Sequence, residues 1–189
     1  MNSFIQIKLF FVVCLFASAI YPQENIFEAI RSNSSEFVKS LRHGDQRINA
    51  YEKDTGKTPL LLAIEQNDET DALYLAIQLV ERGAIINQPN SQNGMTPLHM
   101  AAQQDFPILV FYLLKMGANP NLTNNENYNV WQFTHQINRS SMARWISFFY
   151  GKIIQQRQSS NDQQLTKKDF EELHDNILQT YNNGLQSRL

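Results

Sequence analysis

An internal repeat is the feature that most constrains how this chain can fold. The eight residues GKTPLLLA at 56–63 recur as GMTPLHMA at 94–101. A second landmark follows each copy in the same order, LVERGAIIN at 79–87 and LKMGANPN at 114–121, with an apolar stretch of helical length before it. Repeated units of this size cannot bury an apolar face alone and must stack on their neighbours. The repeat therefore predicts an elongated array.

The spacing of the copies is uneven. Gly56 and Gly94 lie 38 residues apart, whereas a degraded third copy begins at Asn127, 33 residues after Gly94. A partial copy also precedes the first, over 26–49. Four of the five extra residues of the longer unit fall between its Thr-Pro pair and its glycine, and we place these in the acidic stretch 66–71; the fifth falls in the finger. This predicts a longer connection between two helices, either a tolerated surface loop or a protrusion that contacts a partner.

The residues that recur in each copy have physical roles. A Thr hydroxyl before a helix can accept a hydrogen bond from an unpaired amide, and Pro fits the first helical turn. A glycine after the second helix can take the left-handed conformation that ends it. We expect these roles for Thr58, Pro59, Gly83, Thr96, Pro97 and Gly117.

The pattern G-x-T-P-L-H-x-A-A followed by L-L-x-x-G-A-x-x-N resembles the ankyrin repeat. The resemblance implies an all-α repeat solenoid of about four units over 24–155, with inner repeats at about 55–87 and 93–121 and a degenerate unit at each end. It implies that His99 forms hydrogen bonds within the array. It also implies a non-catalytic module that binds an unidentified protein partner through its finger tips and the concave surface of its first helices.

Carried over position by position, the resemblance predicts the surface that contacts a partner. Most of its side chains are amides or small polar groups, in keeping with the 19 Asn and 18 Gln of the chain. The candidate binding residues are Asp54, Thr55, Lys57, Glu65, Gln66, Gln92, Asn93, Met95, Gln103, Gln104, Asn125, Glu126, Tyr128 and Gln136.

The first residues are typical of a secretory signal. Lys8 precedes the apolar run LFFVVCLFA, and Ala17 and Ala19 supply small residues at a cleavage site. We expect a signal peptide at 1–19 and an exported protein, periplasmic or secreted, that has no membrane segment after cleavage; an uncleaved anchor is the alternative. The single cysteine, Cys14, lies inside the apolar run after Val13, which argues against a lipoprotein signal. Cleavage would remove it, leaving no thiol chemistry.

The C-terminal part predicts two further helices. The first, from Ser141 to about Gln156, repeats apolar residues on one face. A polar linker at 156–164 then leads to a C-terminal amphipathic helix and tail at 165–189. That helix either folds back over the last repeat or binds a partner. We expect a monomer unless this helix self-associates.

Several classes of chemistry are disfavoured. A net charge of −2 gives no basic surface for nucleic acid. Glu171 and His174 have the spacing of a helical metal ligand pair, but a carboxylate-bridged site needs a second copy, so we expect no metal, cofactor or catalytic residue. N-x-[ST] sequons occur at Asn33, Asn121 and Asn138. A narrower functional alternative is a periplasmic immunity or inhibitor protein that neutralises a toxin or lipase.

Overall fold

The computed structural model describes residues 25–159, which form helices joined by short loops, without strands in that range. The helices come in pairs. In chain order they are α2 (Ile26–Arg31), α3 (Ser35–Ser40), the 3-10 helix η1 (Gln46–Asn49), α4 (Pro59–Ile64), α5 (Glu69–Glu81), α6 (Pro97–Gln104), α7 (Pro107–Lys115), α8 (Val130–Gln136) and α9 (Ser140–Ser159).

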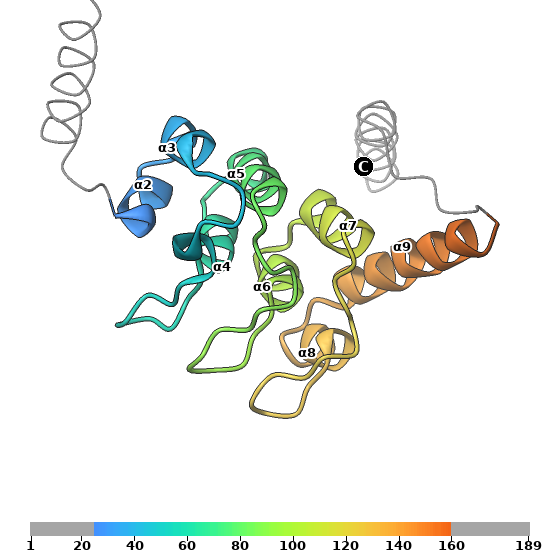
Figure 1. Cartoon of the computed structure of the whole chain (residues 1–189). Coiled ribbons are helices and arrows are strands. Elements are labelled where there is room, and N and C mark those ends of the chain that lie inside the picture. The colour runs from blue at the N-terminus through green and yellow to red at the C-terminus, as the bar shows by residue number, and fades with distance from the viewer. Residues whose placement is uncertain (1–24, 160–189) are drawn as a thin grey trace, which may run out of the picture.

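The pairs stack side by side into an array (Figure 1). The first helices α2, α4, α6 and α8 pack in one row, and the second helices α3, α5, α7 and α9 pack in another. Loops lead from each second helix to the next first helix and project on the side of the first row. We call the projecting parts fingers 1, 2 and 3, at residues 50–58, 88–96 and 122–129. The expected solenoid of four units is confirmed.

The two threonines cap the inner first helices. Thr58 Oγ1 accepts a hydrogen bond from the backbone N–H of Leu61 at 3.3 Å, and Pro59 occupies the first turn of α4. Thr96 and Pro97 repeat the arrangement in α6. At the ends of the second helices, Gly83 and Gly117 have φ values of +99° and +96°, where a side chain would be strained.

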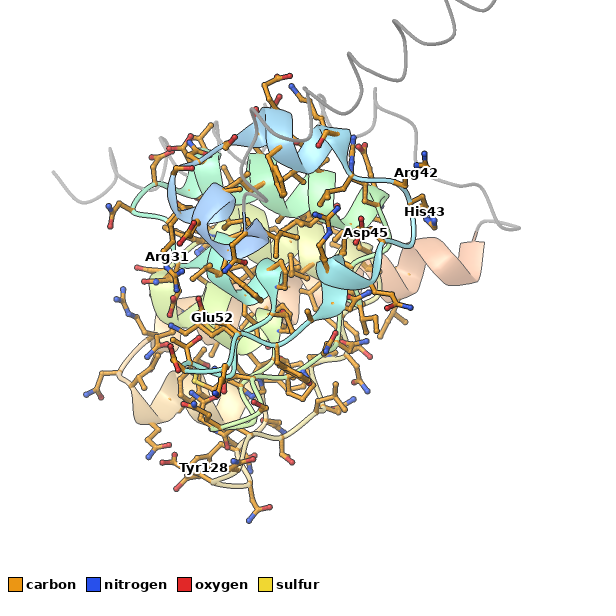
Figure 2. All side chains as sticks on the ribbon, turned by 60° about the vertical axis from the view of Figure 1, so that its left-hand side comes forward. Arg31, Arg42, His43, Asp45, Glu52 and Tyr128 are labelled. Carbon is orange, nitrogen blue, oxygen red and sulfur yellow. The ribbon has the colours of Figure 1, made fainter. Side chains whose placement is uncertain are left out.

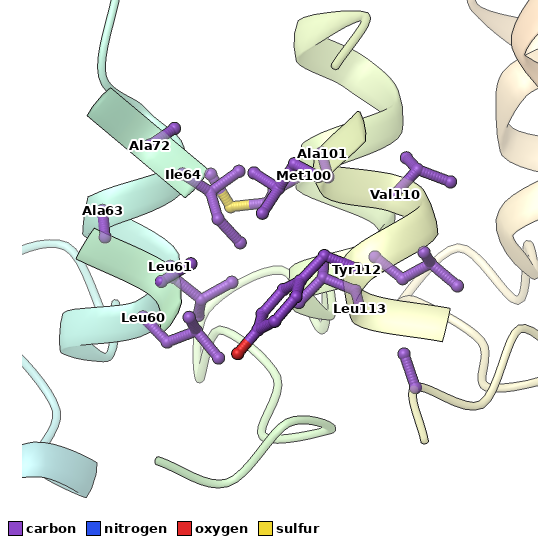
Figure 3. Packing of buried hydrophobic residues seen from close by; sticks show 14 of the residues in the cluster. Leu60, Leu61, Ala63, Ile64, Ala72, Met100, Ala101, Val110, Tyr112 and Leu113 are labelled. Atoms are coloured by element: carbon purple, nitrogen blue, oxygen red, sulfur yellow. The ribbon is translucent and has the colours of Figure 1, made fainter. Parts of the chain in front are cut away.

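One continuous apolar core runs through the array (Figure 3). Leu61 and Ile64 of α4 are fully buried, as are Ala101 of α6 and Leu113 of α7. The alanines let neighbouring helices approach closely, while the larger side chains fill the space between the rows. Burial of one leucine or isoleucine contributes about 1.5–3 kcal/mol, and the helices pack both within each unit and between neighbouring units, so both kinds of contact stabilise the array.

The extra residues of the longer unit are placed differently from the prediction. The connection between α4 and α5 spans 65–68 and is two residues longer than that between α6 and α7 at 105–106. Most of the insertion instead lengthens the second helix, since α5 has 13 residues and α7 has 9. The prediction of a loop over 66–71 was wrong for Glu69 onward, because Asp68 caps α5 by accepting from the N–H groups of Thr70 and Asp71.

The last described helix corrects a second boundary. Helix α9 continues to Ser159, so residues 156–159 are helical and the linker predicted to begin at 156 was wrong there. A helix through this stretch keeps its backbone groups paired, and none of its residues is proline. The signal peptide at 1–19, the rest of the linker and the helix expected at 165–189 lie outside the described residues.

Candidate protein-binding surface

The fingers are tied to one another by hydrogen bonds. The backbone N–H of Ser91 donates to the carbonyl of Gly56 at 2.9 Å, and that of Asn125 donates to Asn93 at 3.0 Å. Side-chain amides extend the contact: Gln92 Nε2 donates to the carbonyl of Asp54 at 2.9 Å, and Asn125 Nδ2 donates to that of Gln92 at 2.9 Å. The three fingers therefore form one connected surface.

Glycines allow this close approach. Gly56 and Gly94 have φ values of +65° and +72°. A Cβ atom at Gly56 would overlap with Ser91 of the next finger, and one at Gly94 would overlap with Asn125. The glycine that opens each repeated motif is thus required by both backbone conformation and contact with the neighbouring finger.

Asparagines at the base of the fingers form a second series of contacts. Asn49 Nδ2 donates to the carbonyl of Gly83 at 3.0 Å, and its Oδ1 accepts from the N–H of Ile85 at 2.8 Å. Asn87 does the same one unit later, with Gly117 at 3.3 Å and Asn119 at 2.8 Å. We call Asn49 and Asn87 the asparagine ladder. Each member holds the unit that follows it.

His99 links the second and third fingers from inside the array. The ring Nδ1 lies 2.8 Å from Thr96 Oγ1, and Nε2 lies 3.1 Å from the carbonyl of Tyr128. Because that carbonyl can accept but not donate, Nε2 carries the proton and Nδ1 accepts. Burial lowers the pKa of His99, although the bond to Tyr128 opposes the shift. The neutral ring also contacts Phe133 edge-on.

Charged pairs flank the first finger. Arg31 Nη2 lies 2.6 Å from Glu52 Oε1, and Figure 2 shows the two side chains side by side. Burial raises the pKa of Glu52, but hydrogen bonds from Thr55 and Arg31 outweigh this and hold it below its usual value. Lys57 Nζ lies 2.6 Å from Glu65 Oε2. These groups are largely paired with each other.

Within residues 25–159, no group of three or more His, Cys, Asp or Glu side chains is placed to hold a metal ion. The helices of the same range also include none that is both long and apolar enough to cross a membrane.

A model of ankyrin repeats in three copies matches residues 26–124, more than half of the chain. The chain belongs to the ankyrin-repeat family. Ankyrin repeats are generally protein-interaction modules.

The curated relatives are much longer proteins. A putative E3 ubiquitin-protein ligase XBAT34 from Arabidopsis thaliana is 33% identical over 124 residues, which cover 65% of this chain and 32% of that protein. The putative ankyrin repeat protein FPV031 of fowlpox virus is 42% identical over 71 residues, covering 38% and 20%. The chain thus spans a third or less of the length of these relatives.

A solved structure supports the fold. The ankyrin repeat domain of Bcl-3 superposes with a TM-score of 0.51 at 22% identity, covering 63% of this chain and 50% of that one. At this identity the likeness concerns the ankyrin fold alone.

The candidate binding residues fall into three groups, which differ in exposure and in their contacts within the array. Met95 is buried at 8% exposure and belongs to the core. A second group makes side-chain hydrogen bonds or ion pairs within the array, or is only half-exposed. It comprises Thr55, Lys57, Glu65, Gln66, Gln92, Asn93, Asn125 and Tyr128.

The third group is exposed. Its side chains make no hydrogen bond or ion pair among residues 25–159, so they are available to another molecule. It comprises Asp54, Gln103, Gln104, Glu126 and Gln136.

Sequence reasoning missed one structural residue. Glu69, at the start of α5, reaches across to the next unit, where its Oε1 accepts from the N–H of Ile108 at 2.6 Å and of Leu109 at 3.0 Å. Helix α7 has no side-chain cap of its own, because Phe106 stands at its N-cap. Glu69 therefore supplies the missing acceptor. The signal in the sequence was Phe-Pro at 106–107, a helix start without a capping side chain.

Proposed function

We propose that this chain is an exported ankyrin module that binds a protein partner through its finger tips and first helices, without catalysis. The observation that carries the proposal is the third group of candidates. Gln103, Gln104 and Gln136 lie near the ends of α6 and α8, on the row that faces the fingers. Asp54 and Glu126 lie at the tips of fingers 1 and 3.

The chemistry of this surface favours a partner recognised by hydrogen bonds. Amide side chains both donate and accept, so they can pair with a partner's backbone or polar side chains. Their lack of charge gives little long-range steering, and association rates near the ordinary 10⁵–10⁷ M⁻¹s⁻¹ with a weak dependence on salt are expected. The carboxylates of Asp54 and Glu126 would add specificity for a donor at either end.

The proposal is tested by capture of a partner from the native compartment, followed by affinity measurements. Replacing Gln103 and Gln104 with arginine should weaken binding by about tenfold or more, because two bulky charges enter the contact. The control replaces Asp71 and Glu81, exposed residues of α5 in the second row, with arginine and should leave affinity within about twofold. Equal effects of the two double variants would refute this surface. If the captured protein is a toxin or lipase and loses its activity, the module is an inhibitor.

Export rests on the sequence of residues 1–19. Its test is the N-terminus of the protein recovered outside the cytoplasm, which should begin at Ile20. Recovery of the intact N-terminus in a membrane fraction would favour an anchor instead.

A further inference from the structure

Finger 2, the middle of the three projecting loops in Figure 1, carries an asparagine that is followed by a glycine. Asn93 is exposed, and Gly94 follows it. Every other asparagine of residues 25–159 precedes a residue that has a Cβ atom. A Cβ atom hinders approach to the backbone nitrogen of its own residue, and glycine has none. Asn93 is therefore the asparagine of this range whose following nitrogen is least hindered.

The side chain of Asn93 is folded back over the backbone of Gly94. Its Oδ1 accepts a hydrogen bond from the N–H of Met95 at 2.9 Å, which closes an Asx turn. The ring closed by this bond contains both the side-chain carbonyl carbon, Cγ, and the backbone nitrogen of Gly94, so the turn holds these two atoms near each other. The N–H of Met95 would also stabilise negative charge that develops on Oδ1 when a nucleophile attacks Cγ.

A second hydrogen bond opposes such an attack. The N–H of Gly94 donates to the carbonyl of Asn90 at 2.9 Å, and this proton must be released before the nitrogen can react. The carbonyl of Asn93 is also held, since it accepts from the N–H of Asn125 at 3.0 Å. Attack by the nitrogen of Gly94 therefore requires a local opening of finger 2 that breaks its bond to Asn90.

We propose that Asn93 is a site of spontaneous deamidation, at a rate set by the local opening of finger 2. The nitrogen of Gly94 attacks Cγ of Asn93, and the new C–N bond closes a five-membered imide. The side-chain amide leaves as ammonia, which takes up the proton from the N–H of Gly94. Water then hydrolyses the imide at one of its two carbonyls. Hydrolysis at Cγ yields aspartate, and hydrolysis at the former backbone carbonyl yields isoaspartate.

Both products change the surface of the fingers. Each carries a carboxylate at position 93, between the exposed Asp54 of finger 1 and the exposed Glu126 of finger 3. In isoaspartate the chain also runs through Cβ and Cγ, which lengthens the backbone by one carbon. The former backbone carbonyl, which accepts from Asn125 in the native chain, becomes the free carboxylate. Deamidation thus alters the contact between fingers 2 and 3.

Peptide mapping of the full chain by mass spectrometry tests the proposal. The chain is incubated near neutral pH in water enriched in ¹⁸O, whose incorporation marks a deamidation that occurs during the incubation. Asn93 should react before every other asparagine of residues 25–159 and should yield both aspartate and isoaspartate. In guanidinium chloride, which unfolds the chain, the rate at Asn93 should rise at least about tenfold. Asn183 also precedes a glycine but lies outside the described residues, so its peptide is quantified separately.

Three results would overturn the proposal. Earlier reaction of another asparagine of residues 25–159 would show that this pair is not the preferred site. Aspartate as the sole product would show direct hydrolysis of the side chain instead of attack by Gly94. Equal rates in the folded and unfolded chain would show that opening of finger 2 does not limit the reaction.

A variant of Asn90 tests the local opening directly. Asn90→Ala removes the side chain that accepts from the N–H groups of Gln92 and Asn93, so it should speed deamidation of the folded chain at least about threefold. The control, Asn49→Ala, removes two hydrogen bonds at the base of the fingers and should leave the rate within about twofold. Equal acceleration by the two variants would contradict a local opening.

A variant of Gly94 tests the chemistry without depending on folding. In guanidinium chloride, Gly94→Ala should slow deamidation of Asn93 at least about tenfold, because a Cβ atom then hinders the attacking nitrogen. An unchanged rate would overturn the role of Gly94. The comparison of folded and unfolded native chain needs no substitution, so the test stays decisive if Asn90→Ala does not fold.

Discussion

The asparagine ladder leads to a prediction with a built-in control. Asn121 follows Gly117 by four residues, as Asn87 follows Gly83, and it occupies the position of Asn49 and Asn87 in the repeat. No finger follows α9 in the described chain. Its side chain is exposed and makes no hydrogen bond among residues 25–159, whereas Asn49 makes two to the next unit. The same substitution at the two sites therefore removes different contacts.

Two hydrogen bonds of about 0.5–1.5 kcal/mol each give a cost of about 1–3 kcal/mol for Asn49→Ala. The carbonyl of Gly83 and the N–H of Ile85, half-buried or exposed, can regain water, which favours the lower half of this range. Asn121→Ala should change stability by less than about 0.5 kcal/mol. For a chain of this size, the first variant should lower Tm by about 3–8 °C and the second by under 2 °C.

Urea unfolding of the full chain measures both variants. Far-UV circular dichroism reports on all helices, and the fluorescence of Trp131 and Trp145 reports on the last unit. Agreement of the two signals tests whether the array unfolds as one cooperative system. Equal destabilisation by Asn49→Ala and Asn121→Ala would show that the asparagines do not act through the next unit and would refute the reasoning.

Three further predictions concern other contacts between units. Burial lowers the pKa of His99, so the folded state disfavours the protonated ring. The stabilisation by the neutral His99 side chain should be complete above pH 6.5 and decline as the pH falls. In thermal melts from pH 7.5 to 5, the difference in Tm between the native protein and His99→Ala should therefore shrink. Burial raises the pKa of Glu69, although the hydrogen bonds from α7 oppose the shift. The stability of the native protein relative to Glu69→Gln should therefore fall as the pH rises through about 4.5 and beyond, and identical pH profiles for the two proteins would contradict this pKa shift. Glu69→Ala should cost about 1–2 kcal/mol at pH 7, because it removes the acceptor that caps α7. In urea unfolding, Gly94→Ala should destabilise the protein by at least about 1 kcal/mol more than Gly44→Ala. Both glycines have positive φ, but a Cβ atom at Gly94 would overlap with Asn125, whereas one at Gly44 would meet no atom within 4 Å.

The repeated motif predicted the order of helices and the role of its Thr-Pro pairs because those features depend on local backbone chemistry. From the motif we placed the insertion in a loop, whereas most of it lengthens α5. The acidic residues misled the prediction, because such residues are as typical of the first turn of a helix as of a loop. The capping of α7 by Glu69 of the preceding unit could not be predicted from the sequence, because these hydrogen bonds depend on how the two units are placed in space.

The candidate surface was predictable in outline but not residue by residue. Amide-rich fingers were expected to face a partner, yet Gln92 and Asn125 use their amides to join neighbouring fingers. Met95 follows the same finger turn as Lys57 but is buried. A sequence pattern predicts which face of the array a residue lies on. Whether its side chain is free to contact a partner depends on the hydrogen bonds and packing that the neighbouring units supply.

The asparagine ladder also bears on how such a chain can change in length. Asn49 and Asn87 offer the same pair of groups to the unit that follows, so this one contact is repeated at the junction between the first two units and at the junction between the next two. A duplicated inner unit inserted after either asparagine would therefore keep this contact at both of its joints. Within residues 25–159 no glycine loop follows α9 to engage Asn121. A unit added in the middle of the array would thus find its asparagine contacts already in place.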